Sequence, residues 1–577
     1  MGSQPDSRSE EDAQAGQESL GVAARWLEAR MMAATGQMQE VQTLFGHHQS
    51  VEHAAVLLAI PALISQGLLQ ARQIYQCLPK GYYGLEHILL LLANMALLRI
   101  HNPEQLKTCK PGELGKIIGL DRVPEVKCLR EKLSQIVLQN KAEEFERHLS
   151  KQWIEQQACL YFYIDGHVRI YHGQQASLQK KFVSRQKLCL AGTTEYWVND
   201  QHGQPFMFFI GDLNERLKDI IEQQIVPALI DDTQNIAPAD DCGQPRFTII
   251  FDRECYEPAF FARLWKDFRI AVITYRKHVK ETWALEDFKD VETQVNEEKV
   301  SMQICEKQVQ LNEHAFREIR KLSSKDHQTS VITTHPTLEQ ATVASQMFSR
   351  WSQENFFKYM IAEFDFDKMI NYGTEVLDQN KQVVNPAYSM LYQQRKKLIE
   401  KRRRLEAQLF EAIEKNIDQS INETKKWLHK QAELKEKIEA LQLEINLKAE
   451  ALSKTPSKIK LADMSEEKRY NRLKKESKMF MNIIKMIAYR AETVLVNLIR
   501  PYYNNHENDR RQIIQTMLSS SANLEPDYEK NILKVTVHSQ STPRANKALQ
   551  HLCQELNQTE TSYPQTNLKL VFIGPVL

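Results

Sequence analysis

The sequence predicts a multidomain α/β protein, in which a mixed β-sheet core is flanked by an N-terminal all-helical domain and a C-terminal long-helical region. Its 577 residues suffice for about three or four domains of roughly 150 residues each. Helical periodicity dominates 19–156 and returns in 376–455, whereas short apolar runs rich in β-branched and aromatic residues occur throughout 157–375. Two of these runs end in an aspartate.

Composition excludes several classes of protein. Hydrophobic residues make up 42% of the chain and charged residues 26%, which is ordinary for a globular protein. The nine cysteines are scattered without a C-x-x-C pair, so we expect a reducing compartment and no structural zinc. The chain starts with no signal-peptide pattern, and its longest apolar runs are shorter than a bilayer span, so no membrane partner is expected. Gly-rich phosphate loops, H-E-x-x-H and G-x-S-x-G are absent from the sequence.

The N-terminal region is predicted to begin with a disordered tail. Residues 1–18 are polar, and 19–156 follow with helical periodicity. Within them, 112–136 predict a short helix that ends near Gly119 and a second helix that Pro124 opens, because proline suits a first helical position.

The second helix of this segment is a candidate DNA contact. It would present Lys127, Arg130 and Lys132 on its polar side, as the recognition helix of a helix-turn-helix does. An ordinary helical hairpin fits the same pattern equally well. Both interpretations stay open at the level of the sequence.

The core segment 157–375 predicts strands first and then alternating helices and strands. The adjoining runs CLYFYID and HVRIYHG, then EYWVND, then PFMFFIGD are strand-like, and an amphipathic helix, the strand FTIIFD, the helix EPAFFARLWKDF and the strand RIAVITYRK follow. The order β-β-β-α-β-α-β gives a mixed sheet covered on both faces, which is a ribonuclease-H-like topology. In this order Asp165 ends the first strand and Asp252 ends the fourth.

A β insertion at 279–338 follows the fifth strand. The runs KVSMQICEKQVQL, FREIRKLSSKD and QTSVITTHP alternate like antiparallel strands. The next helix carries Glu354, which is distant from the two aspartates in sequence but can lie near them in space. Its apolar positions are Leu338, Ala341, Ala344, Met347, Phe348 and Trp351.

Asp165, Asp252 and Glu354 form a candidate catalytic triad. Phosphoryl transfer with two Mg²⁺ ions needs clustered carboxylates and little else from the protein. Each of the three acids also has a non-catalytic interpretation or a rival. Asp165 precedes a glycine and could be a turn residue, Glu254 is a rival for Asp252, and Glu354 could be a solvated helix residue.

These strands, acids and insertion resemble the DDE transposases of bacterial insertion sequences. The similarity is to the branch whose ribonuclease-H-like core is interrupted by β-strands before the catalytic glutamate, and it covers roughly 157–375. In that branch the glutamate helix carries Y-x-x-R-x-x-x-E-x-x-x-x-x-x-K, and Arg350 and Glu354 keep the R-x-x-x-E spacing. Met347 stands at the tyrosine position and Ile361 at the lysine position.

The resemblance implies a reaction and its ligands. A transposase of this branch cleaves transposon ends and joins them to target DNA, with Mg²⁺ bound by Asp165, Asp252 and Glu354 and with Mn²⁺ as a substitute. Partners would be double-stranded DNA and a second copy of the chain, since such enzymes act as dimers on paired ends. The expected location is the bacterial cytoplasm, in association with the nucleoid.

DNA contacts near the site follow from the same resemblance. Arg350 presents a bidentate fork that suits a backbone phosphate, and Lys358 would offer its charge one turn after the glutamate. Trp283 or Trp351 would stack on a flipped base.

Beyond the core, 376–455 predict a basic long helix with a short coiled-coil seam. The seam residues are Leu434, Ile438, Leu441 and Ile445, which could pack within one chain or pair two chains. The basic run RKKLIEKRRR is either a solvated helix face or a rail for DNA phosphates. It contains the candidate DNA-binding residues Arg395, Arg402 and Arg403.

The last segment, 456–577, predicts a linker, an apolar helix and a β-α-β unit. No chemistry follows from these patterns. Two further functions remain open for the whole chain: a ribonuclease-H-like nuclease without strand transfer, and a catalytically inactive, transposase-derived DNA-binding protein. A purely structural coiled-coil protein would leave the aspartates at the strand ends unexplained.

Overall fold

The computed structural model divides the chain into two compact units. The first contains Met1–His172, Gln179–Tyr372 and Lys474–Leu577, and the second Gly173–Leu178 and Gly373–Leu473. The tail predicted at 1–18 lies outside the described residues. These are 26–171, 178, 180–183, 187–212, 215–238, 243–295, 298–366, 374–376, 380, 382–414, 421–464, 471–503 and 507–575.

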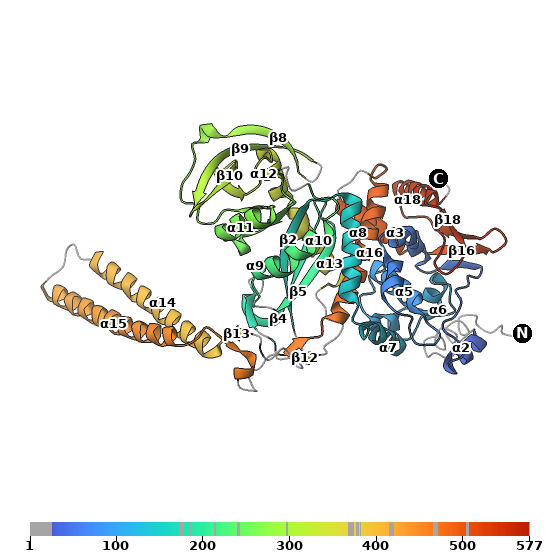
Figure 1. Ribbon diagram of the computed structural model, residues 1–577, viewed down its shortest axis with the longest axis horizontal. Helices are drawn as coiled ribbons and strands as arrows, with labels where there is room; N and C mark the ends of the chain where they lie inside the picture. Colours follow the sequence, from blue (N-terminus) through green and yellow to red (C-terminus); the bar gives the residue numbers. More distant parts are fainter. Residues whose placement is uncertain are drawn as a thin grey trace, which may run out of the picture. The chain divides into compact units, whose positions relative to one another are not determined.

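The first unit contains a ten-stranded sheet (Figure 1). Its strands follow the order β3-β4-β2-β6-β7-β11-β10-β9-β8, and β5 pairs with β4. The strands are β2 Tyr161–Ile170, β3 Lys180–Val183, β4 Leu188–Asn199, β5 Pro205–Asp212, β6 Phe247–Phe251, β7 Ile270–Tyr275, β8 Lys289–Val295, β9 Glu298–Leu311, β10 His314–Leu322 and β11 Gln328–Thr333.

Strand directions in this sheet are mixed. β2, β6 and β7 run parallel to one another, whereas β4 is antiparallel to β2 and β5 is antiparallel to β4. All five residues of β6 are buried, as expected for a central strand covered on both faces. The strands β8 to β11 are antiparallel and extend the sheet through the pairing of β11 with β7.

Alternation along the strands gives the sheet two different faces. Phe162 and Ile164 of β2 pack into a large core that includes Phe251 of β6. Tyr163 and Ile250 face the other way, into a smaller core that includes Met347. The helices around the sheet are α8 Ala142–Gln157, α9 Leu217–Ile220, α10 Val226–Asp232, α11 Pro258–Phe268, α12 Gln340–Ser349 and α13 Trp351–Phe364.

One predicted helix is interrupted in the structure. The amphipathic helix after β5 becomes α9 and α10, joined by a π-helical turn at Ile221–Ile225. Pro227 lies in the first turn of α10. Because proline has no N–H and its ring crowds the preceding turn, the widened turn accommodates it.

The N- and C-terminal segments share a second sheet and the large core. In this four-stranded sheet, β1 His48–Val51 pairs with β16 Ala522–Asp527, followed by β17 Ile532–Val537 and β18 Lys569–Ile573. β17 and β18 are parallel and flank α18, as in the predicted β-α-β unit. The helices of these segments are α2 Leu27–Ala34, α3 Ile60–Ser65, α4 Ala71–Ile74, α5 Leu85–Leu97, α6 Pro111–Ile117, α7 Val126–Val137, α16 Glu476–Ile499, α17 Glu507–Leu518 and α18 Pro543–Gln558.

Helix α16 is almost wholly buried, although it lies late in the chain. It packs against α3, α5 and α8, all from the first part of the sequence (Figure 1). Within the part of the chain that the structure describes, no single helix is long and apolar enough to cross a membrane. One bent pair, Ala54–Ser65 with Leu68–Ile74, has the required length and composition, and its apolar residues are mostly buried in the core.

The second unit is built on a helical hairpin. Figure 1 shows α14 and α15 side by side, over Pro386–Glu414 and Ile421–Lys454. Leu434, Leu441 and Ile445 of α15 are buried, and the two helices pack on each other within one chain. Two short strand pairs complete the unit: β12 Thr374–Val376 with β15 Asn471–Leu473, and β13 Gln382–Val384 with β14 Lys458–Lys460.

Candidate active site

The register of β2 and β6 brings Asp165 and Asp252 next to each other. The last parallel pair joins Ile164 to Phe251, and each aspartate is the next residue of its strand or loop. Asp165 does not end its strand, contrary to the prediction, because β2 stays paired to β4 as far as Ile170 after it leaves β6. The aspartates nevertheless mark the point where β2 and β6 separate.

Arg350 lies against both aspartates. Its Nη1 is 3.5 Å from Asp165 Oδ2, and its Nη2 is 3.8 Å from Asp252 Oδ2. The Arg350 side chain is 11% exposed, that of Asp165 25% and that of Asp252 48%. The site is therefore closed around the arginine and more open on the side of Asp252.

Backbone amides hold the other oxygen of each carboxylate. The N–H of Gly166 donates to Asp165 Oδ1 at 2.9 Å, and the N–H of Arg253 donates to Asp252 Oδ1 at 2.6 Å. Asp252 thereby caps the short 3₁₀ helix Arg253–Cys255. Both Oδ2 atoms are left directed at the same guanidinium.

Burial raises the pKa of Asp165 to about 6. The charges of Asp252 and Glu254 act in the same direction, whereas Arg350 and the Gly166 N–H favour the ionised form. The pair of acids thus needs a nearby cation in order to carry two negative charges at low cost.

Arg350 occupies the junction between two helices. The sequence predicts one helix through Glu354, but the structure has α12 and α13, with Arg350 between them. The two halves pack in different cores: Met347 of α12 in the smaller one, and Phe356 of α13 in the larger one. This division of packing explains a break that contains neither proline nor glycine.

Glu354 lies on the first turn of α13, four residues after Arg350. The side chains of Glu354 and Trp351 fall outside the described part of the structure. Lys358, one turn further on, is exposed. Met347, at the tyrosine position of the family pattern, is fully buried and Ile361 is partly buried, so these apolar replacements belong to the core.

Trp283 lies between β7 and β8 with one face already covered. The guanidinium of Arg320 is 4.1 Å from the centre of its indole, and Lys307 Nζ is 5.0 Å away. Arg320 is fully buried and is held by Glu318 at 2.6 Å. The indole is therefore part of a packed cluster of charged and aromatic groups.

The candidate recognition helix shows a different polar face from the predicted one. α7 begins at Val126, so Pro124 precedes the helix and does not open it. Lys127 and Arg130 are exposed, and Arg130 pairs with Glu104 at 2.5 Å. Lys132 points inward and donates to the carbonyl of Pro79 at 3.3 Å, and burial lowers its pKa.

The basic run lies on α14 of the second unit. Arg402 pairs with Glu406 at 3.1 Å and hydrogen-bonds Gln442 of α15. Arg403 is exposed and Arg395 is partly buried. Arg403 is therefore better placed for a phosphate than Arg402.

Glu195 is a buried acid that the sequence analysis missed. It lies on β4 opposite His167 of β2, and it accepts hydrogen bonds from Arg169 at 2.9 Å and Asn482 at 3.2 Å. Although burial acts in the opposite direction, Lys478 and Arg169 lower its pKa. A charged residue inside the apolar strand EYWVND was the available signal.

The carboxylate oxygens of Asp165 and Asp252 are suitable ligands for a hard divalent cation. Carboxylate oxygens are the ligands that Mg²⁺ prefers, and two of them converge on one cationic group here. Among the described side chains, which exclude that of Glu354, no group of three His, Cys, Asp or Glu residues is placed to hold a metal ion. Asp165 and Asp252 alone would leave such a site incomplete.

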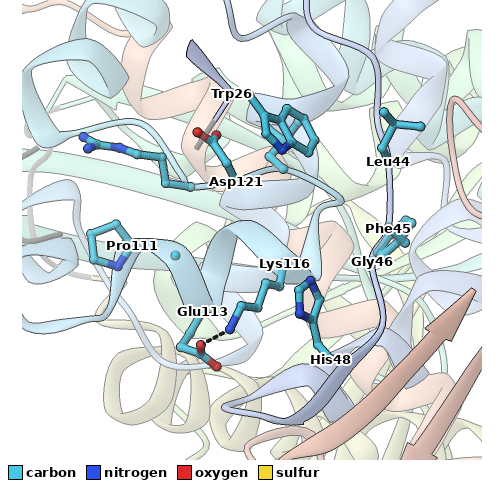
Figure 2. Close-up of a pocket in the computed structure, with 12 residues that line it drawn as sticks. Trp26, Leu44, Phe45, Gly46, His48, Pro111, Glu113, Lys116 and Asp121 are labelled. Atoms are coloured by element: carbon cyan, nitrogen blue, oxygen red, sulfur yellow. Dashed lines mark hydrogen bonds and ion pairs between the residues drawn. The ribbon is translucent and has the colours of Figure 1, made fainter. Parts of the chain in front are cut away.

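A separate cavity of about 260 Å³ opens beside α6 (Figure 2). Its lining contains the ion pair of Glu113 with Lys116, and Asp121, which Arg30 holds at 2.6 Å. None of the predicted site residues lines it. The other lining residues are Trp26, Leu44, Phe45, Gly46, His48, Pro111, Gly112, Leu120 and Arg122.

The fold and the site together define an α/β protein with a paired-carboxylate centre on a mixed sheet. A family model described as a transposase protein matches residues 20–574. The chain belongs to this transposase family, a class of DNA-processing proteins. Neither a curated protein nor a solved structure matches the chain.

Proposed function

We propose that the chain is a DDE-type transposase, which cleaves transposon ends and joins them to target DNA with a divalent metal. The observation that carries the proposal is the register of β2 and β6, which sets Asp165 beside Asp252 on the face where Arg350 and α13 lie. Membership of a transposase family supports the same reaction class.

The arrangement of the core supports a ribonuclease-H-like assignment. β2, β3, β4 and β5 come first in the chain and form one end of the sheet, and β6 and β7 alternate with helices and run parallel to β2. The parallel pairing of β2 with β6 stops at Ile164 and Phe251, which sets Asp165 and Asp252 side by side. Residues 279–338, with β8 to β11, would be the β insertion of the DDE branch.

The metal would be held by Asp165, Asp252 and Glu354. When bound, Mg²⁺ or Mn²⁺ would lower the pKa of the attacking water or 3′-hydroxyl and stabilise the leaving oxygen. The protein's own part is to hold the carboxylates still: the amides of Gly166 and Arg253 fix one oxygen of each aspartate. Arg350 balances their charge and carries a planar fork that suits a DNA phosphate.

DNA binding would use cations outside this centre. Lys127 and Arg130 on α7, Lys358 on α13 and Arg403 on α14 are exposed. Each can neutralise a backbone phosphate without reading sequence, although Arg130 must first leave its ion pair with Glu104. Base stacking is better sought from Trp351 than from Trp283, since Arg320 already covers Trp283.

The test is cleavage of double-stranded DNA carrying the element's own ends, in Mg²⁺ and in EDTA. Asp165→Asn and Glu354→Gln should each lower the rate at least about a thousandfold, or about 4 kcal/mol of transition-state stabilisation. Asp267→Asn, which alters an exposed acid on α11, should cleave like the wild type.

Each outcome of this assay distinguishes the proposed function from one of the alternative functions. End cleavage and joining that require Mg²⁺ and both acids support the proposal, and cleavage without joining indicates a nuclease. DNA binding without cleavage indicates an inactive descendant. Full activity of Asp165→Asn overturns the site assignment.

A further inference from the structure

Three charged residues of α16 lie along the helix that carries Glu354. Lys478, Lys485 and Glu492 are spaced by seven residues, which is two helical turns, so they share one face of α16. Lys485 and Glu492 are buried. Charged side chains are rarely buried without partners of opposite charge or hydrogen-bonding groups. The partners of Lys485 and Glu492 include residues of α13 and of the segment that follows it.

The two lysines bind the C-terminal end of α13. Lys485 Nζ donates to the carbonyl of Phe364 at 2.7 Å and to that of Asp365 at 3.3 Å. Lys478 Nζ donates to the carbonyl of Phe366 at 3.0 Å. The last carbonyls of a helix lack partners within it and carry partial negative charge, so Lys485 caps α13 at Phe364. Lys478 holds Phe366, two residues beyond the end of the helix.

Glu492 holds the middle of the same helix. It accepts a hydrogen bond from the hydroxyl of Tyr359, and Arg99 Nη2 lies 2.7 Å from its carboxylate. Arg99 also pairs with Glu363 of α13 at 3.1 Å. From the other side, Arg511 Nη1 pairs with Glu492 at 3.2 Å.

Aromatic packing fills the space between these polar contacts. The ring of Tyr489 on α16 lies 5.2 Å from that of Phe356 and 6.5 Å from that of Phe364. The same face of α16 reaches the sheet, because Asn482 donates to Glu195 of β4. Helix α13 is thus fixed at its middle and its end by one helix, which is also bonded to the catalytic sheet.

We infer that α16 is a positioning element of the active site, and that Lys478, Lys485 and Glu492 set the place of α13 along its axis and so the place of Glu354. The inference rests on the proposed function. It gives the C-terminal segment a role: a slide of α13 along α16 would break the contacts of both lysines and the Glu492 cluster together. These three residues act through α13 and contact no reacting group.

The test compares two buried cations of α16. Lys485→Met removes the cap of α13. Arg490→Met removes a buried cation whose partners lie elsewhere, on Gln66 at 2.8 Å, on the carbonyl of Pro205 at 3.0 Å and over Trp153. Lys485→Arg should restore the cap in part, because a guanidinium can also donate to the carbonyls.

Two readouts are needed. Hydrogen exchange of the full-length protein should show faster exchange in the peptide 351–366 for Lys485→Met but not for Arg490→Met. Mn²⁺ binding, followed by electron paramagnetic resonance, should weaken at least about tenfold in Lys485→Met only, as for loss of a residue that orients a ligand. Tyr359→Phe, which removes one hydroxyl from the Glu492 cluster, should show the same changes to a smaller degree if Lys485→Met does not fold.

The results distinguish this inference from the proposed function. Equal exchange of 351–366 in Lys485→Met and Arg490→Met, or unchanged exchange in Tyr359→Phe, overturns the positioning role. If Mn²⁺ binds the wild type and Asp165→Asn equally, the metal site fails. The exchange comparison then still decides whether α16 holds α13.

Discussion

Arg350 Nη1 lies 3.5 Å from Asp165 Oδ2, so the carboxylate centre already contains a cation of its own. The same guanidinium reaches Asp252 at 3.8 Å. A divalent ion that binds both Oδ2 atoms must therefore compete with Arg350. We expect the arginine to leave this position when the metal binds and to become available for a phosphate.

Removing Arg350 should strengthen metal binding in the absence of DNA. Arg350→Gln should bind Mn²⁺ about three- to tenfold more tightly than the wild type, because two partly exposed ion pairs no longer compete. Electron paramagnetic resonance of free Mn²⁺ measures this directly. Arg253→Gln is the matched control, since Arg253 carries the same charge beside Asp252 but lies over the ring of Tyr275. Equal or weaker binding by Arg350→Gln would contradict the competition.

Glu146 should make the stability of the protein fall as the pH rises. Burial raises the pKa of this carboxyl to about 8, and its Oε1 accepts a hydrogen bond from the N–H of Phe208 at 2.6 Å. The folded state therefore binds more protons than the unfolded state between about pH 4.5 and pH 8. In this window the group lowers the free energy of unfolding by at most about 1.4 kcal/mol per pH unit.

Denaturant unfolding at pH 5.5 and pH 8 checks this prediction. Glu146→Gln keeps an acceptor for Phe208 and should lose less stability between these pH values than the wild type. Glu144→Gln alters an exposed neighbour and should follow the wild type. A parallel loss in all three proteins would show that Glu146 is not protonated in the fold.

Replacing Gly115 should destabilise the α6–α7 hairpin. A Cβ at this position would lie 2.5 Å from the Cα of Arg122, and a backbone atom cannot turn aside as a side chain can. Gly115→Ala should cost about 1–3 kcal/mol, as other overpacked sites do. At Gly81 a Cβ would meet only ordinary contacts, so Gly81→Ala should stay within about 0.5 kcal/mol of the wild type. Thermal or chemical unfolding of both variants measures the difference, and equal stabilities would refute the close approach.

Two neighbouring arginines of α14 should contribute unequally to DNA binding. Arg403→Gln should reduce the slope of log affinity against log salt concentration by about 0.9, the value for one lost phosphate contact. Arg402 is engaged by Glu406 and Gln442, so Arg402→Gln should change the slope less. Fluorescence anisotropy at several salt concentrations gives both slopes. If both slopes stay at the wild-type value, the basic run is a solvated face.

Local sequence patterns predicted secondary structure well where a short run of residues favours only one conformation. FTIIF could be assigned to a central strand because a short, fully apolar run with β-branched residues is typical of a buried strand. Phe247–Phe251 forms that strand in the structure. The extent of β2 was less accessible. Asp165 and Gly166 resemble a turn, but the pairing with β4 carries the strand through them.

Features that depend on distant partners were not predictable from local pattern. The break at Arg350 arises because α12 and α13 pack in different cores. The sequence pattern placed Lys132 on the exposed face of an amphipathic helix. In the structure its ammonium group points inward, because the carbonyl of Pro79, distant in sequence, accepts its hydrogen bond. The strand β1 is only four residues long, and its partner β16 is near the other end of the chain.

The pairing of His48 with Leu524 has a consequence for the timing of assembly during synthesis. Translation delivers Asp165, Asp252 and Glu354 well before α16 and β16. A nascent chain therefore holds all three acids while it lacks α16, which contacts α13, and β16, which pairs with β1. Contacts this distant in sequence slow folding, because the long loop between the partners must close first. We therefore expect the candidate site to reach its final geometry only after α16 has been synthesised, and a copy truncated before α16 to lack the contacts that hold α13.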